Sequence, residues 1–525
     1  MKRRDFVKHT SHGLLLPGIL GSLGVNPFGN SILSTLLNNS VDTDHVLVMI
    51  FLNGGNDGLN TVIPLDQMSA LNEVRPQVVL PESKILKLKG ESVGLHPSLT
   101  TFKDMFDDGR LKIVQNVGYP DPNFSHFRST DIWMSASGSD RVVETGWAGR
   151  YLNYEYPNFP NDFPNATMPD PLAMEMGYLS SLMFQGPTGN LGFTINNPEQ
   201  FYRLVENKEQ SAPDTKAGRK LQYIRHIARQ SQTYGERLKE LSESTQNKAV
   251  YPEGNSLADQ LKIVARLIAG GSKTRMYMVF QGGYDTHDNQ ANQGDHTLGE
   301  HADLLRDLND AVKAFMTDME LQKADDRVMG MTFSEFGRRI VSNASNGTDH
   351  GHAAPQFIFG NAVEGGVLGN NPQIDKSMTA QDNLLMEFDF RQVYASLLEQ
   401  WLCVEPDDIS SILLGDFDPL SIAPNSDCMI TAVHDANVRA GTNYISVSPN
   451  PLNGLASVEF TSLGETLSID LIDVQGKVVR RITQGNYARG QHQVSMDTSD
   501  LKPGTYFCRI QSRSINQSKQ VVKFY

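Results

Sequence analysis

Three residues of types that bind metal ions lie close together in the segment GTDHGHAAP, residues 347–355. Asp349 and His350 are adjacent, and Gly351 separates them from His352. Carboxylates and imidazoles suit zinc, manganese and similar divalent ions. Adjacent side chains normally diverge, but the glycines of this loop allow it to turn them onto one ion or to divide them between two. The alternative is a polar loop with exposed histidines.

A second pair of candidate ligands occurs in QGGYDTHDNQ, residues 281–290. Asp285 and His287 are two positions apart, so they can share an ion where the chain is extended or turned. His301 follows in DHTLGEHADLL, where a position in the first turn of a helix is the favoured interpretation. The pair therefore forms the second candidate metal site.

The segment NGGNDGLN, residues 53–60, contains Asn56 and Asp57 among glycines that permit a close approach of the backbone to a ligand. The alternative for Asp57 is a helix cap.

The segment NFSHFRSTDIW, residues 123–133, contains Ser125, His126 and Arg128. Such a serine could be a nucleophile or a hydroxyl ligand of a metal ion. The GxSxG pattern of serine hydrolases does not surround it, and an ordinary polar loop is the alternative.

The segment TFSEFGRR, residues 332–339, contains Glu335, a possible ligand or hydrogen-bond acceptor. Arg338 and Arg339 could bind an anion. If they lie on a helix they point in different directions, so one of them is expected to be structural.

Each of these segments follows or adjoins an apolar run that predicts a strand buried on both faces. The predicted strands cover residues 45–55, 111–118, 275–283, 327–337 and 355–360. Helical patterns lie between and after them, at residues 303–321 and 390–402, with a long solvent-facing helix predicted at 215–245. This alternation predicts an α/β core with a mainly parallel sheet, in which ligands bind beyond the carboxyl ends of the strands. The candidate metal ligands are Asp57, Asp285, His287, Asp349, His350 and His352.

Composition limits the class of protein. The chain has 525 residues, of which 39% are hydrophobic, so more than one domain and a sizeable core are expected. A net charge of −14 argues against a nucleic-acid partner, because phosphate backbones require clustered lysine and arginine. Three cysteines do not make a disulfide framework, although one bridge remains open.

The two ends of the chain predict export. Residues 1–30 combine a basic start with a short apolar stretch, and Arg3-Arg4-Asp5-Phe6 resembles a twin-arginine signal; a general secretory signal is the alternative. Residues 31–44 are predicted to be a linker, 45–420 the core and 421–440 a second linker. Residues 441–525 contain short alternating strands, which predict a small β-sandwich. No later segment reaches the length of a transmembrane helix.

Residues 45–405 resemble an exported bacterial family catalogued as domain of unknown function 1501, within the alkaline phosphatase and sulfatase superfamily. The phrases that carry the resemblance are FLNGGNDGLNTVIP, FSHFRSTDIW, GWAGRYL, GGYDTHDNQ, FSEFGRR, GTDHGHAAPQFIFG and DFRQVYASLLEQWL. The resemblance implies a three-layer sandwich with a mostly parallel sheet and one or two divalent ions, zinc or manganese.

Carried over to this chain, the resemblance implies that Asp57, Asp349 and His350 form one metal site. It implies that Asp285, His287 and His352 form the other, with His301 as a possible replacement for His287. Ser125 falls at the position of the superfamily nucleophile, where a metal ion would activate it, and Arg128 or Arg338 would bind the non-bridging oxygens. Asn56, His126 and Glu335 are further possible site residues.

The tail resembles the type A sorting domain of the type IX secretion system of Bacteroidetes. The matching pieces are SPNPLNG, DVQGKVV, LKPGTYFCRI and KQVVKFY. The expected protein is thus exported through the periplasm to the cell surface or medium, with the secretion machinery as the partner of residues 441–525. The expected activity is hydrolysis of phosphate or sulfate esters, on a small-molecule or glycan substrate. The alternative is a non-catalytic surface binding or assembly protein that retains the fold.

Overall fold

The computed structural model describes residues 44–161, 163–177, 180–195, 232–424, 426 and 428, and a C-terminal region. In that region it describes residues 445–450, 452, 454–462, 466–473, 477–488, 490–512 and 516–523. The predicted signal peptide, nearly all of the first linker and most of the second lie outside these residues. Of the helix predicted at 215–245, residues 232–244 are described and are helical.

A nine-stranded sheet forms the centre of the core, in the order β13-β5-β12-β11-β1-β10-β6-β9, with β14 also paired to β5. Its strands are β1 (Val46–Asn53), β5 (Leu111–Gly118), β6 (Ala173–Met176), β9 (Gly192–Ile195), β10 (Met276–Gly282), β11 (Val328–Phe333), β12 (Ala354–Phe359), β13 (Gly366–Leu368) and β14 (Phe388–Asp389). The five strands predicted from apolar runs are confirmed within a few residues at each end.

The sheet is parallel except at β12, which runs antiparallel to both β11 and β5. Parallel strands bring their carboxyl ends to one edge of a sheet. Because β12 is reversed, its beginning lies at that same edge. The loop that precedes β12, which contains GTDHGH, therefore meets the loops that follow β1, β5, β10 and β11.

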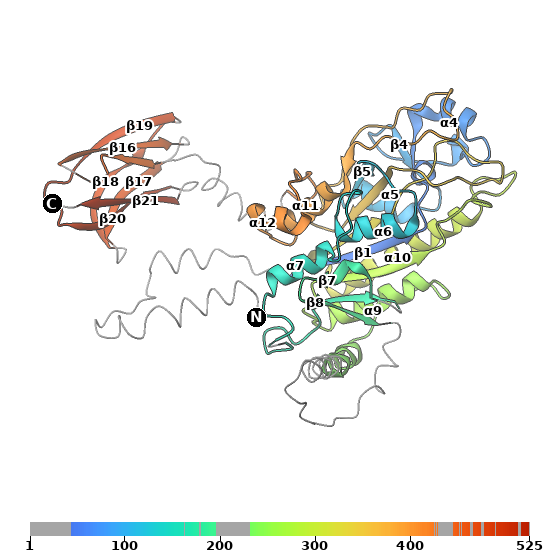
Figure 1. The fold of residues 1–525 in the computed structure, drawn as a ribbon, viewed down its shortest axis with the longest axis horizontal. Helices are drawn as coiled ribbons and strands as arrows, with labels where there is room; N and C mark the ends of the chain where they lie inside the picture. The colour runs from blue at the N-terminus through green and yellow to red at the C-terminus, as the bar shows by residue number, and fades with distance from the viewer. Residues whose placement is uncertain are drawn as a thin grey trace. The chain divides into compact units, whose positions relative to one another are not determined.

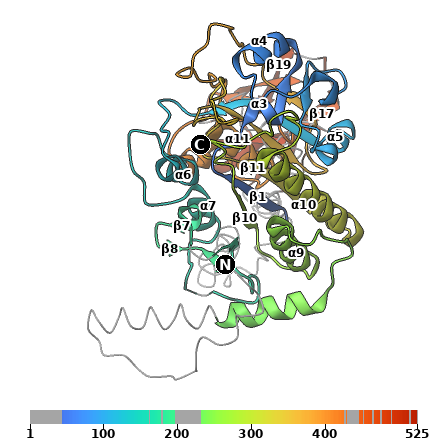
Figure 2. The same cartoon turned by 90° about the vertical axis from the view of Figure 1, so that its right-hand side faces the viewer.

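Both faces of the sheet are covered by helices. Along β1, Leu47, Met49 and Phe51 enter one apolar cluster, while alternate residues such as Val48 and Ile50 enter another. The first cluster includes residues of α6 (His126–Ser135), α7 (Trp147–Glu155), α11 (Phe390–Gln400) and α12 (Pro406–Leu413). The second includes residues of α5 (Thr100–Asp107), α9 (Ser256–Ala269) and α10 (Glu300–Gln322). Figure 2 shows α9 and α10 on one side of β1 and β10, and α6 and α7 on the other. The predicted α/β sandwich of three layers is confirmed.

Shorter elements complete the core. A small sheet joins β2 (Val62–Pro64), β4 (Val93–Leu95) and β3 (Leu86–Lys87), and β7 (Gln185–Gly186) pairs with β8 (Gly189–Asn190). The helices α3 (Gly58–Thr61) and α4 (Met68–Val74) follow β1, and single 3₁₀ turns lie at residues 65–67, 82–84, 182–184 and 325–327.

The C-terminal region is a separate compact unit built from strands alone among its described residues. One sheet has the order β15 (Ile445–Ser448), β16 (Leu455–Ser462), β19 (Gly490–Asp497). The other has the order β18 (Val478–Asn486), β17 (Thr466–Asp473), β20 (Gly504–Gln511), β21 (Asn516–Lys523). Figure 1 shows the strands of this unit. Buried side chains from both sheets form one core, as a β-sandwich requires.

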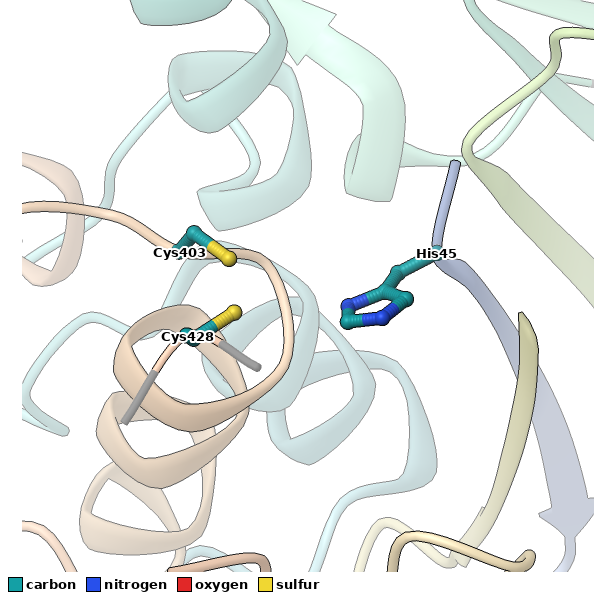
Figure 3. A group of neighbouring side chains, drawn as sticks. All are labelled: His45, Cys403 and Cys428. Atoms are coloured by element: carbon teal, nitrogen blue, oxygen red, sulfur yellow. The ribbon is translucent and has the colours of Figure 1, made fainter. Parts of the chain in front are cut away.

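Cys403 and Cys428 are disulfide-bonded, and Cys508 is a buried free thiol. The single bridge that the sequence left open is therefore present. Figure 3 draws these two cysteines with His45; because a disulfide offers no thiolate, this group is not a candidate metal site. Among the described residues, no helix has both the length and the apolar character needed to cross a membrane.

Candidate metal centre

Glycines bring the loops at the carboxyl edge of the sheet into contact. Gly54, directly after β1, has a positive φ, and a Cβ there would overlap the backbone nitrogen of Asp285 in the loop after β10. A Cβ on Gly351 would overlap the backbone of Arg338 in the loop after β11. The glycine between the two histidines is thus required by the close approach of another segment.

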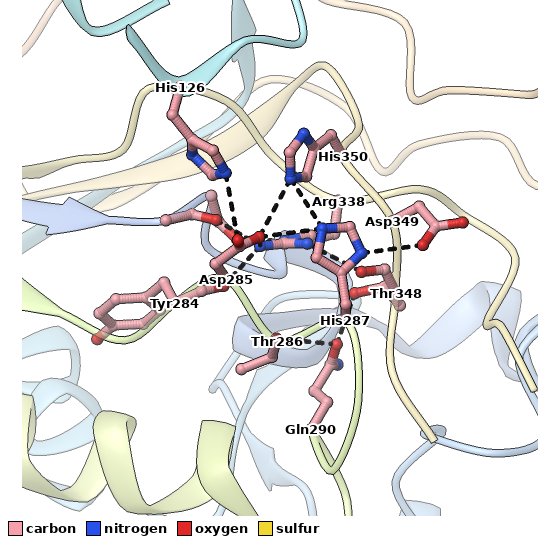
Figure 4. A network of polar contacts seen from close by, with 12 residues as sticks. His126, Tyr284, Asp285, Thr286, His287, Gln290, Arg338, Thr348, Asp349 and His350 are labelled. Atoms are coloured by element: carbon pink, nitrogen blue, oxygen red, sulfur yellow. Dashed lines mark hydrogen bonds and ion pairs between the residues drawn. The ribbon is translucent and has the colours of Figure 1, made fainter. Parts of the chain in front are cut away.

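Side chains from three loops converge on the carboxylate of Asp285 (Figure 4). The Nε2 atoms of His287 and His350 each lie 3.1 Å from Asp285 Oδ1, and they lie 2.9 Å from one another. His126 Nε2 approaches Asp285 Oδ2 from α6, at 3.4 Å. We call these four residues, together with Asp349, the open cluster, because Asp285 and His287 are 48% and 43% exposed.

The other ring nitrogen of each histidine has an acceptor. Nδ1 of His126 donates to Glu335 Oε1 at 2.8 Å, and Glu335 is fully buried. Nδ1 of His287 donates to Asp349 Oδ1 at 3.0 Å, and Nδ1 of His350 donates to the Phe124 carbonyl at 2.8 Å. A hydrogen bond at Nδ1 leaves the lone pair of a neutral imidazole on Nε2, and metal-binding histidines are oriented in this way.

Three of these side chains, those of His126, Asp285 and His350, fit a divalent ion as they stand, and His287 lies beside them. Ligand atoms bound to one ion at about 2.0–2.2 Å lie roughly 3 Å apart, which is the spacing around Asp285 Oδ1. The Nε2 atoms of His287 and His350, 2.9 Å apart, can either share a proton or bind the same cation. His126 Nε2 is a buried atom with no hydrogen-bond partner among the described residues. Ligand atoms of His126, Asp285 and His350 all lie within 4.8 Å of one another.

The protonation states of Asp285 and His350 suit metal binding. Burial alone would raise the pKa of Asp285, but the hydrogen bond and charge of Arg338 outweigh it and lower that pKa to about 2. Burial also lowers the pKa of His350. Asp285 is therefore ionised and His350 neutral near pH 7, which are the forms that bind a cation. The pKa of His126 is raised, chiefly by its hydrogen bond to Glu335.

Arg338 stabilises this arrangement through hydrogen bonds to Asp285 and to the surrounding loops. Its side chain is fully buried and donates to Asp285 Oδ1 at 2.7 Å. It also donates to the carbonyls of Gly54, Gly55, Tyr284 and Thr348. Arg128 is turned away, with its Nη2 on the carbonyls of residues 138, 139 and 141. Arg128 and Arg338, the two arginines to which the family resemblance assigns anion binding, thus fix loops in this structure.

Asp57 and His301 belong to a second group, which we call the buried cluster and which also contains Arg75 and His96. Asp57 is 1% exposed, forms an ion pair with the fully buried Arg75, accepts from Gln290 Nε2, and caps α3 through the Leu59 amide. His301 Nε2 lies 2.9 Å from the side-chain oxygen of Asn56. The structure therefore places Asp57, Asn56 and His301 apart from the four side chains around Asp285.

His352 also lies outside the open cluster, because its Nε2 is 2.8 Å from the Tyr119 carbonyl at the end of β5. Ser125 is exposed and occupies the N-cap position of α6, where its side chain makes no capping hydrogen bond. It lies between two residues that contact the cluster, since Phe124 binds His350 and His126 faces Asp285. Ser125 is therefore adjacent in the chain to two residues of this region.

The sequence did not identify two residues that help to position this site. The Phe124 carbonyl orients His350, and a backbone group gives no signal in a sequence. Gln290 accepts from Thr286 and Thr348 and donates to Asp57, so it joins both ligand loops to the buried cluster. It lies in the conspicuous segment GGYDTHDNQ, but an amide in a polar loop is not distinctive.

Comparison with family models gives two matches. Residues 44–413 match the model described as "Protein of unknown function (DUF1501)". Residues 446–523 match the model described as "Secretion system C-terminal sorting domain". A search of curated proteins finds no match.

Solved structures similar to the chain include a protein in the alkaline phosphatase superfamily from Vibrio parahaemolyticus, at 9% identity and a TM-score of 0.33, covering 88% of this chain and 84% of that one. Another, from Bacteroides thetaiotaomicron and described under the metabolism of multiple glycosaminoglycans, has 10% identity and a TM-score of 0.35, covering 91% and 90%. PorZ of the type IX secretion system of Porphyromonas gingivalis has 16% identity and a TM-score of 0.12; this chain spans 13% of it. At these identities and TM-scores, the likenesses support no statement about activity.

Proposed function

Since the chain belongs to the DUF1501 family, whose description assigns no function, we propose its function from the site itself: a metal-dependent hydrolase of phosphate or sulfate esters. One observation carries the proposal. Three histidines have their Nδ1 atoms occupied by acceptors and direct Nε2 toward one ionised, half-exposed carboxylate.

We propose one divalent ion, zinc or manganese, held by His126, Asp285, His287 and His350. This donor set differs from the two sites implied by the family resemblance, since Asp57 and His352 have other partners here. A divalent ion bound there acts as a Lewis acid and withdraws charge from an ester oxygen. The exposure of Asp285 and His287 supports access of a substrate to this position.

The chain's own residues have distinct proposed roles. Ser125 Oγ attacks the phosphorus or sulfur atom, the bond to the leaving alcohol breaks, and the hydroxyl proton passes to the leaving oxygen. Water then cleaves the serine ester and restores Ser125. Glu335 and Asp349 hold the rings of His126 and His287, and Arg338 keeps Asp285 ionised and in place.

The sorting-domain match implies export and an interaction with secretion machinery through residues 446–523. We propose that the machinery is of type IX and that the substrate is an extracellular small molecule or glycan. The twin-arginine-like signal in residues 1–30 is proposed as the route across the inner membrane.

The test is a measurement of metal content and turnover on the purified full chain. Mass spectrometry should find about one equivalent of zinc or manganese, and the double variant His126→Ala, His350→Ala should lose it. Phosphate and sulfate esters should be hydrolysed by the wild type, and Ser125→Ala should keep the metal but lose turnover.

A metal-loaded chain that hydrolyses neither ester class would overturn the enzymatic proposal and leave a binding or assembly protein that retains the fold. Full turnover in Ser125→Ala would remove the role of that serine alone.

A further inference from the structure

The two consecutive arginines that end FSEFGRR have different surroundings. The guanidinium of Arg338 is fully buried and has five acceptors, including Asp285. Arg339 is only half-buried, and within the described part of the chain its guanidinium donates to a single acceptor, the Gln381 carbonyl. Most of its donors are therefore available to a ligand.

Arg339 lies close to the open cluster. Its backbone nitrogen donates to the Asp349 carbonyl at 2.9 Å, which ties it to the loop that supplies His350. Its guanidinium carbon is 5.2 Å from the centre of the Phe124 ring. Phe124 in turn orients His350 through its carbonyl and directly precedes Ser125. The guanidinium is thus held over the residue that links the serine to a candidate metal ligand.

Two contacts fix the position of this guanidinium. The aromatic face of Phe124 attracts the cation, and the Gln381 carbonyl anchors one nitrogen. Gln381 lies in a turn that is closed by Thr379 and Asp382, since the Thr379 amide and hydroxyl both donate to Asp382 Oδ2. A guanidinium held on two sides loses less conformational entropy when it binds an anion.

The charge of the region favours a further cation. Asp285, Asp349 and Glu335 place three carboxylates around the histidines, against the single buried charge of Arg338. An anionic ester approaching from the solvent would be repelled unless a divalent ion and a further positive group were present. Arg128 cannot take this role where it stands, because its Nη2 is directed to three backbone carbonyls.

We infer that Arg339 is the residue that binds the tetrahedral oxyanion of the substrate, through the non-bridging oxygens of a phosphate or sulfate group. The inference rests on the proposed function and deepens it by naming the residue that binds the anionic group of the substrate. The planar fork of arginine matches two oxygens of such a group, whereas a carboxylate ester or an amide offers no such pair.

The test uses isothermal titration of the full chain, loaded with zinc or manganese, with inorganic phosphate and, separately, with inorganic sulfate. Arg339→Met should weaken binding of the preferred anion by about tenfold or more, because a charge-assisted hydrogen bond is lost. Arg339→Lys should restore part of the affinity, as it keeps the charge without the fork. Metal content should be unchanged in both variants. The matched control is Arg306→Met on α10, an exposed arginine that pairs with Asp303; it should bind anions as the wild type does.

The preferred anion identifies the ester class, and KM for that class should rise in Arg339→Met by the same factor as the anion affinity falls. Wild-type anion affinity in Arg339→Met, or a wild-type chain that binds neither anion, would overturn the inference. A chain that binds anions through Arg339 but cleaves no ester would overturn the proposed function and leave the anion site standing. Ester turnover with an unchanged KM in Arg339→Met would overturn the anion site and leave the proposed function standing.

Discussion

The open cluster and the buried cluster contain the same residue types, aspartate and histidine beside an arginine, yet their surroundings differ. In the buried cluster Asp57 forms an ion pair with Arg75 and is buried, and His301 contacts the side-chain amide of Asn56. In the open cluster Asp285 is 48% exposed and faces both Arg338 and three imidazole Nε2 atoms. Residue type alone therefore does not identify a metal ligand; its partners and its access to solvent do.

The largest difference between the clusters should appear in stability. Asp57→Ala leaves the buried Arg75 without its counter-charge, so the free energy of unfolding should fall by about 3–5 kcal/mol. Asp349→Ala removes a carboxylate that is 53% exposed and should cost less than about 1 kcal/mol. Denaturation followed by tryptophan fluorescence reports on the core, since Trp133, Trp147 and Trp401 all lie in its apolar clusters.

A stable Asp57→Ala protein that has lost its metal would reverse the comparison. It would make Asp57 a ligand, as the family resemblance implies.

Metal affinity should depend on the open cluster and not on the buried cluster. Asp349→Asn weakens the acceptor that orients His287, and such outer partners typically contribute about 10- to 100-fold in affinity. His301→Gln in the buried cluster should leave affinity at the wild-type value. Competition with a chromophoric chelator would measure both. Equal losses in the two variants would mean that the clusters act as one site.

The buried cluster should also make the core sensitive to acid. Burial, with a smaller contribution from His301, lowers the pKa of His96 from 6.5 to about 3, and burial lowers that of His301 to about 4. The unfolded chain therefore takes up more protons below pH 6.5, so this stability is complete above pH 6.5 and is lost as the pH falls toward 4. Each histidine should account for about 1 kcal/mol between pH 6.5 and about pH 5.5.

His96→Asn keeps an acceptor for the Ser98 amide and removes one titrating group. Unfolding by denaturant at several pH values should show a shallower slope in this variant. An unchanged slope would contradict the assignment of acid sensitivity to the buried cluster.

The smallest expected effect concerns the link between the clusters. Thr348→Val removes one buried hydrogen bond to Gln290, which keeps its bond from Thr286. The loss of stability should be about 1 kcal/mol, measured by the same denaturation. A loss several times larger would show that the two clusters are not energetically separate.

Much of the fold could be predicted, because buried strands leave continuous apolar runs and their glycine-rich ends mark the edge where ligands bind. The meeting of Asp285, His287, Asp349 and His350 follows from that rule. The partner of Asp57 could not be predicted, since Arg75 lies 18 positions away with no periodic signal. The same holds for Arg338 and Arg339, whose identical side chains differ only in what the folded loops place around them.

Gln290 has a consequence for how an ion would enter. Its single amide fixes Thr286, which lies between Asp285 and His287, and Thr348, which precedes Asp349. Each loop is thus held by a threonine that donates to Gln290, so the candidate ligands beside these threonines are positioned before any cation arrives. Loading should therefore proceed without folding, with a heat-capacity change near zero and an association rate close to the diffusion limit. A centre formed in this way would take up its ion after the chain has folded, so the proposed metal would depend on the ions available at that stage.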